Sequence, residues 1–365
     1  MAALLEAQDV TKVFSGGLLK RERVIALRDF SFTVPEEQPI FTAIVGESGS
    51  GKTTLARLLL GLTTPTTGDV RYRGISLKQL NREQRRAFLR DVQAIFQDPF
   101  EVYNPFYKVD HVLELPIRMF HLAKSAQEMR NRIEEALITV GLRPEETLGR
   151  YPHQLSGGQR QRVMIARALL LRPKVIIADE PVSMVDASLR ATILSSLQQL
   201  HREYGISILY ITHDLATAYQ VANDVLVLYR GTVVEAGDAG LIIREPEHPY
   251  TRLLVSSVPL PDPDRQWLGE RALGQPVSGL MPRGTAFCVF YDRCPYAMPI
   301  CVEQTPPLFR TGDRRVVACY LYRDSPTIDR RNLAAGGVFT NGRTEVSPPS
   351  YSALKREAQP DSPHA

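Results

Sequence analysis

The residues best suited to chemistry form the segment GESGSGKT at 46–53, which fits the pattern G-x-x-x-x-G-K-[ST]. An apolar run, FTAIVG, precedes it and a helical pattern, TTLARLLLG, follows it, as a phosphate-binding loop requires. The glycines let backbone N–H groups wrap phosphate oxygens, Lys52 neutralises the β- and γ-phosphates, and Thr53 binds Mg²⁺. The candidate nucleotide-binding residues are Gly46, Glu47, Ser48, Gly49, Ser50, Gly51, Lys52, Thr53 and Thr54.

Three further polar residues follow short apolar runs. A second Mg²⁺ ligand is expected at the end of another buried strand, and VIIADE supplies Asp179 there. Glu180 is the candidate for orienting and polarising the attacking water, since phosphoryl transfer leaves mainly positioning and electrostatics to the protein. Gln97 and His213 stand at similar strand ends, where open α/β sheets bind ligands. Taken singly, Glu180, Gln97 and His213 are also typical of structural residues.

The segment LSGGQ at 155–159 has the composition of a second anion site. A hydroxyl and two glycines open a helical pattern there, where the first N–H groups lack internal partners and the helix dipole attracts negative charge. Ser156 is also typical of an ordinary helix N-cap, and the same donors can serve both roles. The chain therefore carries two candidate phosphate-binding segments.

The elements that must position these residues follow from hydrophobic periodicity. Continuous apolar runs at 41–46, 174–179 and 207–212 are typical of strands buried on both faces. Apolar residues three and four apart predict a helix over 189–200, between the last two runs. This alternation of strand and helix predicts an α/β fold with a parallel sheet.

Other local patterns extend the order of elements. Ser125 and Glu128 form a capping box, and the helix that they start is predicted to end at a glycine. The segment VLVLYRGTVVEAG predicts a hairpin that turns at Arg230 and Gly231. Proline then becomes frequent, which indicates a boundary near residue 260, and the polar composition predicts a disordered tail over 326–365.

Composition and charge restrict the class of protein. The chain has 365 residues, 44% of them hydrophobic and 23% charged, as is ordinary for a globular protein. Its 44 basic and 40 acidic residues give a net charge of only +4, and this even balance does not indicate a nucleic-acid partner. No apolar run approaches the roughly 18 residues of a membrane span, and MAALLEAQDVTKVF lacks the basic start of a signal peptide. We therefore expect a cytosolic protein that can dock on a membrane protein.

Together these motifs resemble the nucleotide-binding subunits of ATP-binding cassette (ABC) transporters over residues 4–258. Walker A at 46–53, the signature LSGGQ at 155–159 and Walker B at 175–179 occur in the family's order. The catalytic residues that the resemblance implies are Glu180, the switch residue His213 and the Q-loop residue Gln97. The implied Mg²⁺ ligands are Thr53, Gln97 and Asp179, the implied adenine-stacking residue is Phe14, and the implied D-loop residues are Ser183 and Asp186.

Members of this family work as head-to-tail dimers in which each ATP lies between Walker A of one subunit and the signature helix of the other. The resemblance therefore implies that ATP and Mg²⁺ are bound, and that the second phosphate site serves the partner's ATP. The residues implied in that contact are Leu155, Ser156, Gly157, Gly158 and Gln159. The implied fold is a P-loop, RecA-like ABC ATPase core with antiparallel β and helical subdomains and a small cysteine-containing C-terminal extension.

The segments HPYTRLLVSSVPLPDPD and CVFYDRCPYAMPIC narrow the resemblance to the oligopeptide/dipeptide group of ABC importers. The expected domains are an ABC nucleotide-binding domain at 1–258, the extension at 259–325 and the tail at 326–365. The implied partners are a second, non-identical ABC ATPase subunit, two transmembrane permease subunits and, indirectly, an extracytoplasmic solute-binding protein, with no nucleic acid. The implied location is the cytoplasmic face of the cell membrane.

Two alternatives remain open at the level of sequence. Related importers carry oligosaccharides, nickel or other small solutes, and SMVD at 183–186 and DPFEVYNP at 98–105 depart from the usual family segments. A soluble mechanical ABC ATPase of DNA repair or chromosome organisation would share the signature motif. Such proteins insert long coiled coils between Walker A and the signature, whereas the residues between them here show no sustained heptads.

All four cysteines of the chain, Cys288, Cys294, Cys301 and Cys319, fall close together with the spacing C-x5-C-x6-C-x17-C. In a reducing compartment this clustering favours a metal or cluster site over disulfides. The spacing lacks the close pairs of zinc sites, no histidine lies among the cysteines, and four thiolates can hold an iron–sulfur cluster. We predict a structural [4Fe–4S] cluster, as members of the resembling group hold, with Zn²⁺ or unliganded thiols as alternatives.

Overall fold

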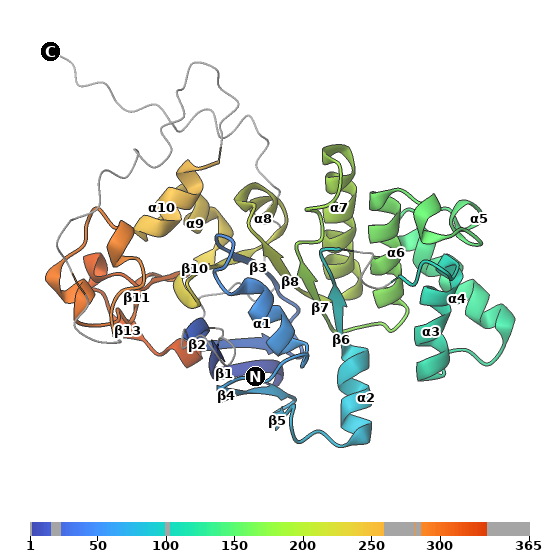
Figure 1. The fold of residues 1–365 in the computed structure, drawn as a ribbon, viewed down its shortest axis with the longest axis horizontal. Coiled ribbons are helices and arrows are strands. Elements are labelled where there is room, and N and C mark those ends of the chain that lie inside the picture. The colour runs from blue at the N-terminus through green and yellow to red at the C-terminus, as the bar shows by residue number, and fades with distance from the viewer. Residues whose placement is uncertain (1, 16–22, 99–102, 259–280, 282–285, 334–365) are drawn as a thin grey trace, which may run out of the picture.

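A nine-stranded sheet in the order β13-β11-β12-β10-β9-β3-β8-β7-β6 forms the centre of the fold (Figure 1). The computed structural model describes residues 2–15, 23–98, 103–258, 281 and 286–333. Most of the proline-rich stretch after residue 258, the tail beyond residue 333 and residues 99–102 of DPFEVYNP lie outside the described residues.

The parallel half of this sheet contains the three apolar runs that were predicted as buried strands. Its members are β3 (Phe41–Val45), β6 (Val92–Ile95), β7 (Val175–Asp179), β8 (Ser207–Thr212) and β9 (Asp224–Tyr229). β3 and β8 are buried along their whole length, which confirms the prediction of strands covered on both faces. Because these five strands point the same way, the residues that follow them gather at one edge of the sheet.

The rest of the sheet is antiparallel and includes C-terminal residues. β10 (Thr232–Asp238) folds back on β9 at Arg230 and Gly231, whose φ angles of 44° and 77° confirm the predicted hairpin turn. The strands β12 (Arg315–Val317), β11 (Leu308–Gly312) and β13 (Thr327–Ile328) then continue the sheet beyond β10. The cysteine-containing segment is therefore built onto the central sheet and shares its hydrophobic core.

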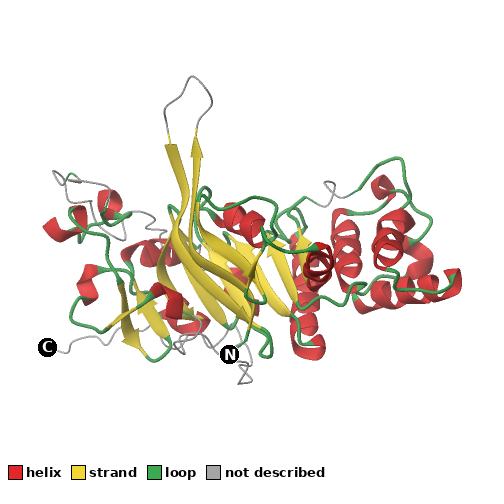
Figure 2. Cartoon of the chain, turned by 90° about the horizontal axis from the view of Figure 1, so that it is seen from below, coloured by secondary structure: helices red, strands yellow, loops and turns green. Residues whose placement is uncertain are grey.

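A second sheet, antiparallel and ordered β2-β1-β4-β5, shares a core with α1 (Lys52–Leu59) and one face of the central sheet. Its long strands β1 (Ala3–Ser15) and β2 (Arg23–Pro35) extend beyond the body of the molecule (Figure 2). The shorter strands β4 (Thr67–Tyr72) and β5 (Ile75–Ser76) complete it. This is the antiparallel β subdomain that the family resemblance implied.

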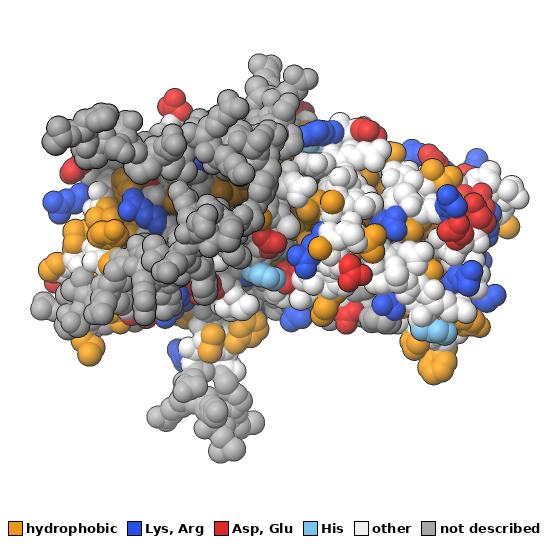
Figure 3. Space-filling model, turned by 90° about the horizontal axis from the view of Figure 1, so that it is seen from above, with side chains coloured by type: hydrophobic (Ala, Val, Ile, Leu, Met, Phe, Trp, Pro, Cys, Tyr) orange, Lys and Arg blue, Asp and Glu red, His pale blue; other side chains and the backbone are white. Residues whose placement is uncertain are grey.

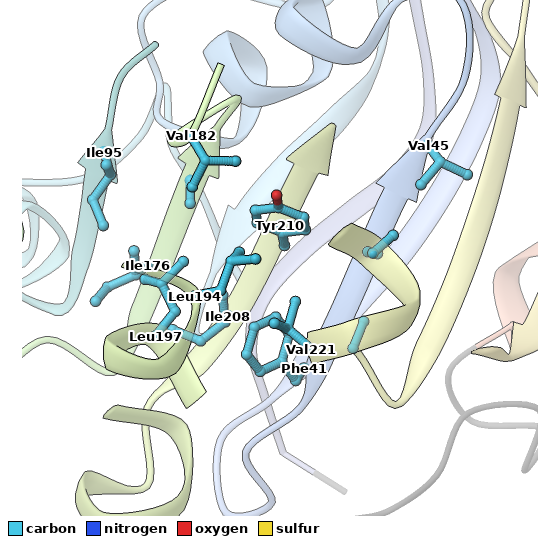
Figure 4. Packing of buried hydrophobic residues seen from close by; sticks show 14 of the residues in the cluster. Phe41, Val45, Ile95, Ile176, Val182, Leu194, Leu197, Ile208, Tyr210 and Val221 are labelled. Carbon is cyan, nitrogen blue, oxygen red and sulfur yellow. The ribbon is translucent and has the colours of Figure 1, made fainter. Parts of the chain in front are cut away.

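Helices cover the opposite face of the central sheet. They are α7 (Ala187–Tyr204), α8 (Leu215–Val221), α9 (Ala239–Arg244) and α10 (Pro249–Ser256). Figure 4 shows Ile176 and Ile208 of the strands against Leu194 and Leu197 of α7, with Phe41 beside α8. All of these side chains are at most 1% exposed, so the strand ends that carry polar residues rest on a rigid, close-packed layer.

A helical subdomain lies beyond α7 and contains α3 (Val109–Phe120), α4 (Ala126–Thr139), α5 (Pro144–Thr147) and α6 (Gly157–Leu169). The helix α2 (Arg82–Asp91) packs on β6.

The predicted capping box at the start of α4 is formed only in part. The Ser125 hydroxyl accepts a hydrogen bond from the Glu128 N–H at 3.1 Å, as predicted, but the Glu128 carboxylate accepts from the Lys124 N–H instead of the Ser125 N–H. Among the described residues between α1 and α6, no helix exceeds the 14 residues of α4, so they contain no long coiled coil. Figure 3 shows basic and acidic side chains interspersed over the visible face of this subdomain.

The start of the predicted disordered tail is ordered. Thr327 and Ile328 pair with β11, Leu333 is 1% exposed, and Arg331 forms a 2.6 Å ion pair with Asp9. The polar composition of 326–365 is an average over the whole tail, whereas a few residues at its beginning pair with a strand edge and fill the core. The prediction of disorder was therefore wrong for 326–333.

Candidate nucleotide-binding site

The phosphate-binding loop is folded tightly between β3 and α1. Gly51 precedes α1 with φ of 105°, and a Cβ atom there would lie 2.2 Å from the Ala26 carbonyl oxygen. The Ser50 N–H donates to the Glu47 carbonyl at 3.1 Å and closes the turn. Only glycine allows this backbone path, so the spacing of glycines in the sequence determines the shape of the loop.

The loop curls around the ammonium group of Lys52. Its Nζ donates hydrogen bonds to the carbonyls of Gly46 at 2.7 Å and Glu47 at 2.9 Å, and the residue is only 6% exposed. The pKa of Lys52 is lowered, because burial outweighs the opposite effect of the nearby Glu180, Asp179 and Glu47 carboxylates. A cation held this way in a glycine loop is positioned to neutralise phosphate oxygens.

Asp179 ends β7 beside the loop and has the environment of a cation ligand. Its Oδ1 is buried without a hydrogen-bond partner among the described residues. Burial raises the pKa of Asp179, and the charge of Glu180 acts in the same direction, while the Thr53 hydroxyl and Lys52 oppose the rise. A buried carboxylate oxygen without a donor, next to a threonine hydroxyl, fits the hard oxygen ligands that Mg²⁺ requires.

Glu180 and His213 meet at the ends of neighbouring parallel strands. Oε1 of Glu180 lies 3.0 Å from Nδ1 of His213, and the register of β7 and β8 pairs Asp179 with Ile211. The backbone of Glu180 has φ of 46°, and its N–H donates to the Ile211 carbonyl at 2.9 Å. Such a conformation is uncommon for a residue other than glycine, so the surrounding hydrogen bonds must hold it.

Gln97 lies just past β6, the neighbour of β7, and is exposed. The signature helix α6 contacts the chain on either side of it. The Gln161 amide donates to the Phe96 carbonyl at 3.2 Å, and the Tyr103 hydroxyl donates to the Arg160 carbonyl at 2.9 Å. Gln97 therefore lies at the same edge of the sheet as Asp179. Its neighbours in the chain are hydrogen-bonded to α6 of the helical subdomain.

The predicted adenine-stacking residue lies on the antiparallel sheet, and the D-loop directly follows Glu180. Phe14 is 46% exposed near the end of β1, and the Lys12 ammonium lies 5.0 Å from its ring centroid. In the D-loop, the Ser183 hydroxyl donates to the Glu180 carbonyl at 3.0 Å, and Asp186 is the residue before α7. The D-loop thus supports the backbone of Glu180, while the Phe14 ring is partly exposed beside Lys12.

The signature residues are not brought to the chain's own phosphate-binding loop. Ser156 is the exposed N-cap of α6 and forms a complete capping box with Gln159. A Cβ at Gly158 would lie 2.6 Å from Leu189, so this glycine allows α6 to pack on α7. Figure 1 shows α6 on the far side of α7 from α1. The N-cap interpretation is confirmed, and the exposed helix belongs to a different part of the described chain than the phosphate-binding loop.

Sequence reasoning missed two residues that contact the phosphate-binding loop. The Tyr250 hydroxyl of α10 accepts a hydrogen bond from the Glu47 N–H at 2.8 Å, and Arg293 pairs with the Glu47 carboxylate at 2.9 Å. Neither residue belongs to a motif with the loop. No local pattern could have revealed them, because they lie about 200 or more residues away in the chain.

The four cysteines are buried and close to one another. The Cys288 N–H donates to the Cys301 carbonyl at 2.7 Å. Burial raises the pKa of Cys288 to about 12, of Cys294 to about 11 and of Cys319 to about 12, and neighbouring cysteines add to the rise. In the part of the chain that the structure describes, no group of three or more His, Cys, Asp or Glu side chains is arranged to hold a metal ion. The geometry therefore does not support the predicted [4Fe–4S] or zinc site.

Comparison with known proteins places this site in a family. The model for the ABC transporter family matches residues 27–183, and that for the oligopeptide/dipeptide transporter C-terminal region matches residues 234–301. The oligopeptide transport ATP-binding protein OppF of Escherichia coli K12 is 44% identical over 281 residues, which cover 76% of this chain and 82% of that protein. The di/tripeptide transport ATP-binding protein DppF of Pseudomonas aeruginosa is 41% identical over 323 residues, covering 88% and 98%.

A solved structure with a similar fold is a dimeric ATP-binding cassette in a post-hydrolysis state bound to ADP and Pi. It aligns with a TM-score of 0.57 and 31% identity, covering 64% of this chain and 98% of that one. The chain belongs to the ABC transporter family and is an ATP-hydrolysing subunit with the predicted ABC ATPase fold. Within that family it belongs to the oligopeptide/dipeptide group. None of the helices in the described ranges is long and apolar enough to cross a membrane.

Proposed function

We propose that this chain hydrolyses ATP to drive uptake of oligopeptides or dipeptides by a membrane ABC importer. The observation that carries the ATPase part is the set Lys52, Asp179, Glu180 and His213, gathered at one edge of the parallel strands. The peptide part is supported by the relatives, which are named as oligopeptide and di/tripeptide transport ATP-binding proteins.

The proposed mechanism assigns one task to each side chain. The loop amides and Lys52 hold the β- and γ-phosphates of ATP. Thr53, Gln97 and Asp179 would hold Mg²⁺, which supplies charge neutralisation when bound. Glu180 orients the attacking water and accepts its proton as a general base. His213 holds the Glu180 carboxylate in place through the 3.0 Å contact. The protein thus contributes positioning and electrostatics at a preorganised strand edge.

A complete site would need a second ATPase subunit. The signature residues 155–159 and the loop 46–53 lie on different parts of the described chain, and Ser156 is exposed. The solved ATP-binding cassette with 31% identity is dimeric. A head-to-tail dimer with a second, non-identical ATPase would place the α6 N-terminus of one chain at the γ-phosphate bound by the other.

The helical subdomain offers a surface for the permease subunits. Phe106 is 86% exposed and Met119 is 62% exposed, and the apolar residues Tyr107 and Leu115 are exposed as well. Exposed aromatic and aliphatic side chains in and just before α3 suit contact with another protein. Docking there would place the chain at the cytoplasmic face of the membrane, with an extracytoplasmic solute-binding protein acting only indirectly. Residues 1–258 would form the ATPase domain and 259–325 its extension.

The decisive experiment is purification of the intact complex from detergent-solubilised membranes through a tag on this chain, with identification of its subunits. After reconstitution in vesicles with the solute-binding protein, we expect ATP-dependent uptake of peptides. The matched control is the same complex carrying Glu180→Gln. Uptake of an oligosaccharide or nickel without peptides would refute the peptide assignment, and absence of membrane subunits would refute the importer.

The [4Fe–4S] cluster on the four cysteines stays a prediction of the sequence, which metal analysis can test. The support is chemical, because four buried thiols gather without histidine in a segment of short strands and 3₁₀ turns. Against it stands the lack of a metal-binding arrangement in the described residues. Iron, sulfide and zinc analysis after anaerobic purification decides between the possibilities: near-stoichiometric zinc, or no metal, refutes the cluster.

A further inference from the structure

A segment of the C-terminal extension contacts the phosphate-binding loop directly. Within residues 288–294, called here the bridging segment, the 3₁₀ helix η4 (Tyr291–Arg293) presents Arg293 to Glu47. Nη1 of Arg293 lies 3.1 Å from Oε1 and 2.9 Å from Oε2 of the carboxylate. The two side chains are 31% and 38% exposed, so the pair lies at the rim of the loop and is partly shielded from solvent.

Aromatic rings fix the position of Arg293. Its guanidinium carbon lies 5.7 Å from the ring centroid of Phe290 and 6.0 Å from that of Tyr229, the last residue of β9. Phe290 is fully buried and packs against Tyr229 and Tyr250. An arginine that stacks on aromatic faces has a restricted orientation. The place of the guanidinium is therefore set by the bridging segment and by the core beneath it.

The bridging segment reaches the loop by a second route. Arg230, in the turn between β9 and β10, pairs with Asp292 at 2.9 Å and donates to the Val289 carbonyl at 3.2 Å. The next residue, Gly231, donates its N–H to the Ser50 carbonyl at 2.8 Å. Two separate chains of contacts thus connect the bridging segment to the phosphate-binding loop.

Glu47 is the point where these contacts meet the nucleotide-binding machinery. Its carbonyl accepts a hydrogen bond from the Lys52 ammonium at 2.9 Å. It is also the only acidic residue in GESGSGKT, so its negatively charged carboxylate repels the negatively charged phosphates of a bound nucleotide. Arg293 supplies the compensating positive charge and restrains the residue whose carbonyl orients Lys52.

We propose that Arg293 is a positioning residue for ATP, through which the C-terminal extension sets the nucleotide affinity of the phosphate-binding loop. The inference rests on ATP binding at that loop and not on the transported solute. The Arg293–Glu47 pair acts on the loop that holds the phosphates throughout the reaction. Its loss therefore weakens ATP binding in the ground state and in the transition state alike. Such a change appears in Kd and KM and leaves kcat nearly constant.

The test is a set of charge variants of the full chain, titrated with Mg-ATP by calorimetry. Arg293→Gln should raise Kd by about threefold to tenfold, which corresponds to about 0.7–1.4 kcal/mol, with kcat of the assembled complex within about twofold. Arg293→Lys should recover most of the affinity, because an ammonium still neutralises Glu47. The double variant Glu47→Gln/Arg293→Gln should bind ATP more tightly than Arg293→Gln, because no unpaired carboxylate remains.

The matched control is Arg310→Gln, which removes an arginine of the same extension that hydrogen-bonds to the Gly312 and Asp313 carbonyls. It should leave Kd unchanged. The proposal is overturned by an unchanged Kd in a folded Arg293→Gln, by equal losses in Arg293→Gln and Arg310→Gln, or by a fall in kcat alone. If Arg293→Gln does not fold, a Kd for Arg293→Lys close to wild type supports the proposal and a tenfold loss overturns it. If the complex binds ATP normally but does not take up peptides, the assignment of peptides as the solute is refuted. The inference about Arg293 then still holds.

Discussion

Replacing Glu180 with glutamine should stop turnover while preserving the fold and nucleotide binding. Glutamine has nearly the same size and can adopt the same backbone conformation, with φ of 46° held by the Ile211 carbonyl. Its amide can keep the 3.0 Å contact with His213, so the geometry of the strand edge should persist. What disappears is the negative charge that orients and polarises water, in a side chain that is only 17% exposed.

The expected size of this effect follows from the role of a general base. Such a group contributes about 10²- to 10⁴-fold in rate, which corresponds to about 2.7–5.4 kcal/mol of activation free energy. We therefore expect Glu180→Gln to lower kcat of the assembled ATPase by this factor. The dissociation constant for Mg-ATP should change by less than about threefold, because Lys52 and Asp179 are untouched. An ATP-bound dimer should accumulate as a result.

The assay compares phosphate release and equilibrium ATP binding for wild type, Glu180→Gln and a matched control, Glu203→Gln. Glu203 is an exposed glutamate of α7 that accepts a hydrogen bond from Gln199, so its loss should leave kcat within about twofold. Turnover of Glu180→Gln within a few-fold of wild type would remove this carboxylate from the catalytic role. Loss of ATP binding would show that it acts on affinity instead.

Lys52→Ala removes a buried, charge-assisted donor and should weaken Mg-ATP binding by about ten- to a hundredfold, measured by titration; unchanged affinity would contradict the loop geometry. Ser156→Arg should leave ATP binding by the isolated chain within about twofold but impair turnover of the assembled dimer, and loss of binding by the monomer would refute the assignment in trans. Phe290→Ala should lower the free energy of unfolding in urea by about 3–5 kcal/mol, because the ring is fully buried; a loss below about 1 kcal/mol would contradict this packing.

Much of the site could be predicted from the sequence because its signals are local. The glycine spacing around Lys52 requires one backbone path, and the apolar runs before Asp179 and His213 predict buried parallel strands. Parallel strands place their carboxyl ends at one edge, so residues at those ends gather without any further information. The capping residue Ser156 and the hairpin turn at Arg230 are equally local, since a few neighbouring residues determine each.

Contacts between distant segments could not be predicted in this way. Arg293 and Glu47 are 246 residues apart, and nothing near either residue marks it as the partner of the other. The same holds for β12, whose three residues were part of an expected separate extension and instead pair with β10. The four cysteines were equally ambiguous, because their spacing says that thiols can meet but not how they are arranged.

The sequence by itself determined the chemistry of the phosphate-binding loop, the Walker B carboxylates and the positions of three buried core strands, because each rests on residues that are neighbours in the chain. Only the tertiary structure decided that the C-terminal extension continues the central sheet and holds Glu47 through Arg293. The physical reason is that an ion pair or a sheet edge requires only that two segments meet after folding. Packing of the whole core determines that meeting, and no short stretch of sequence encodes it.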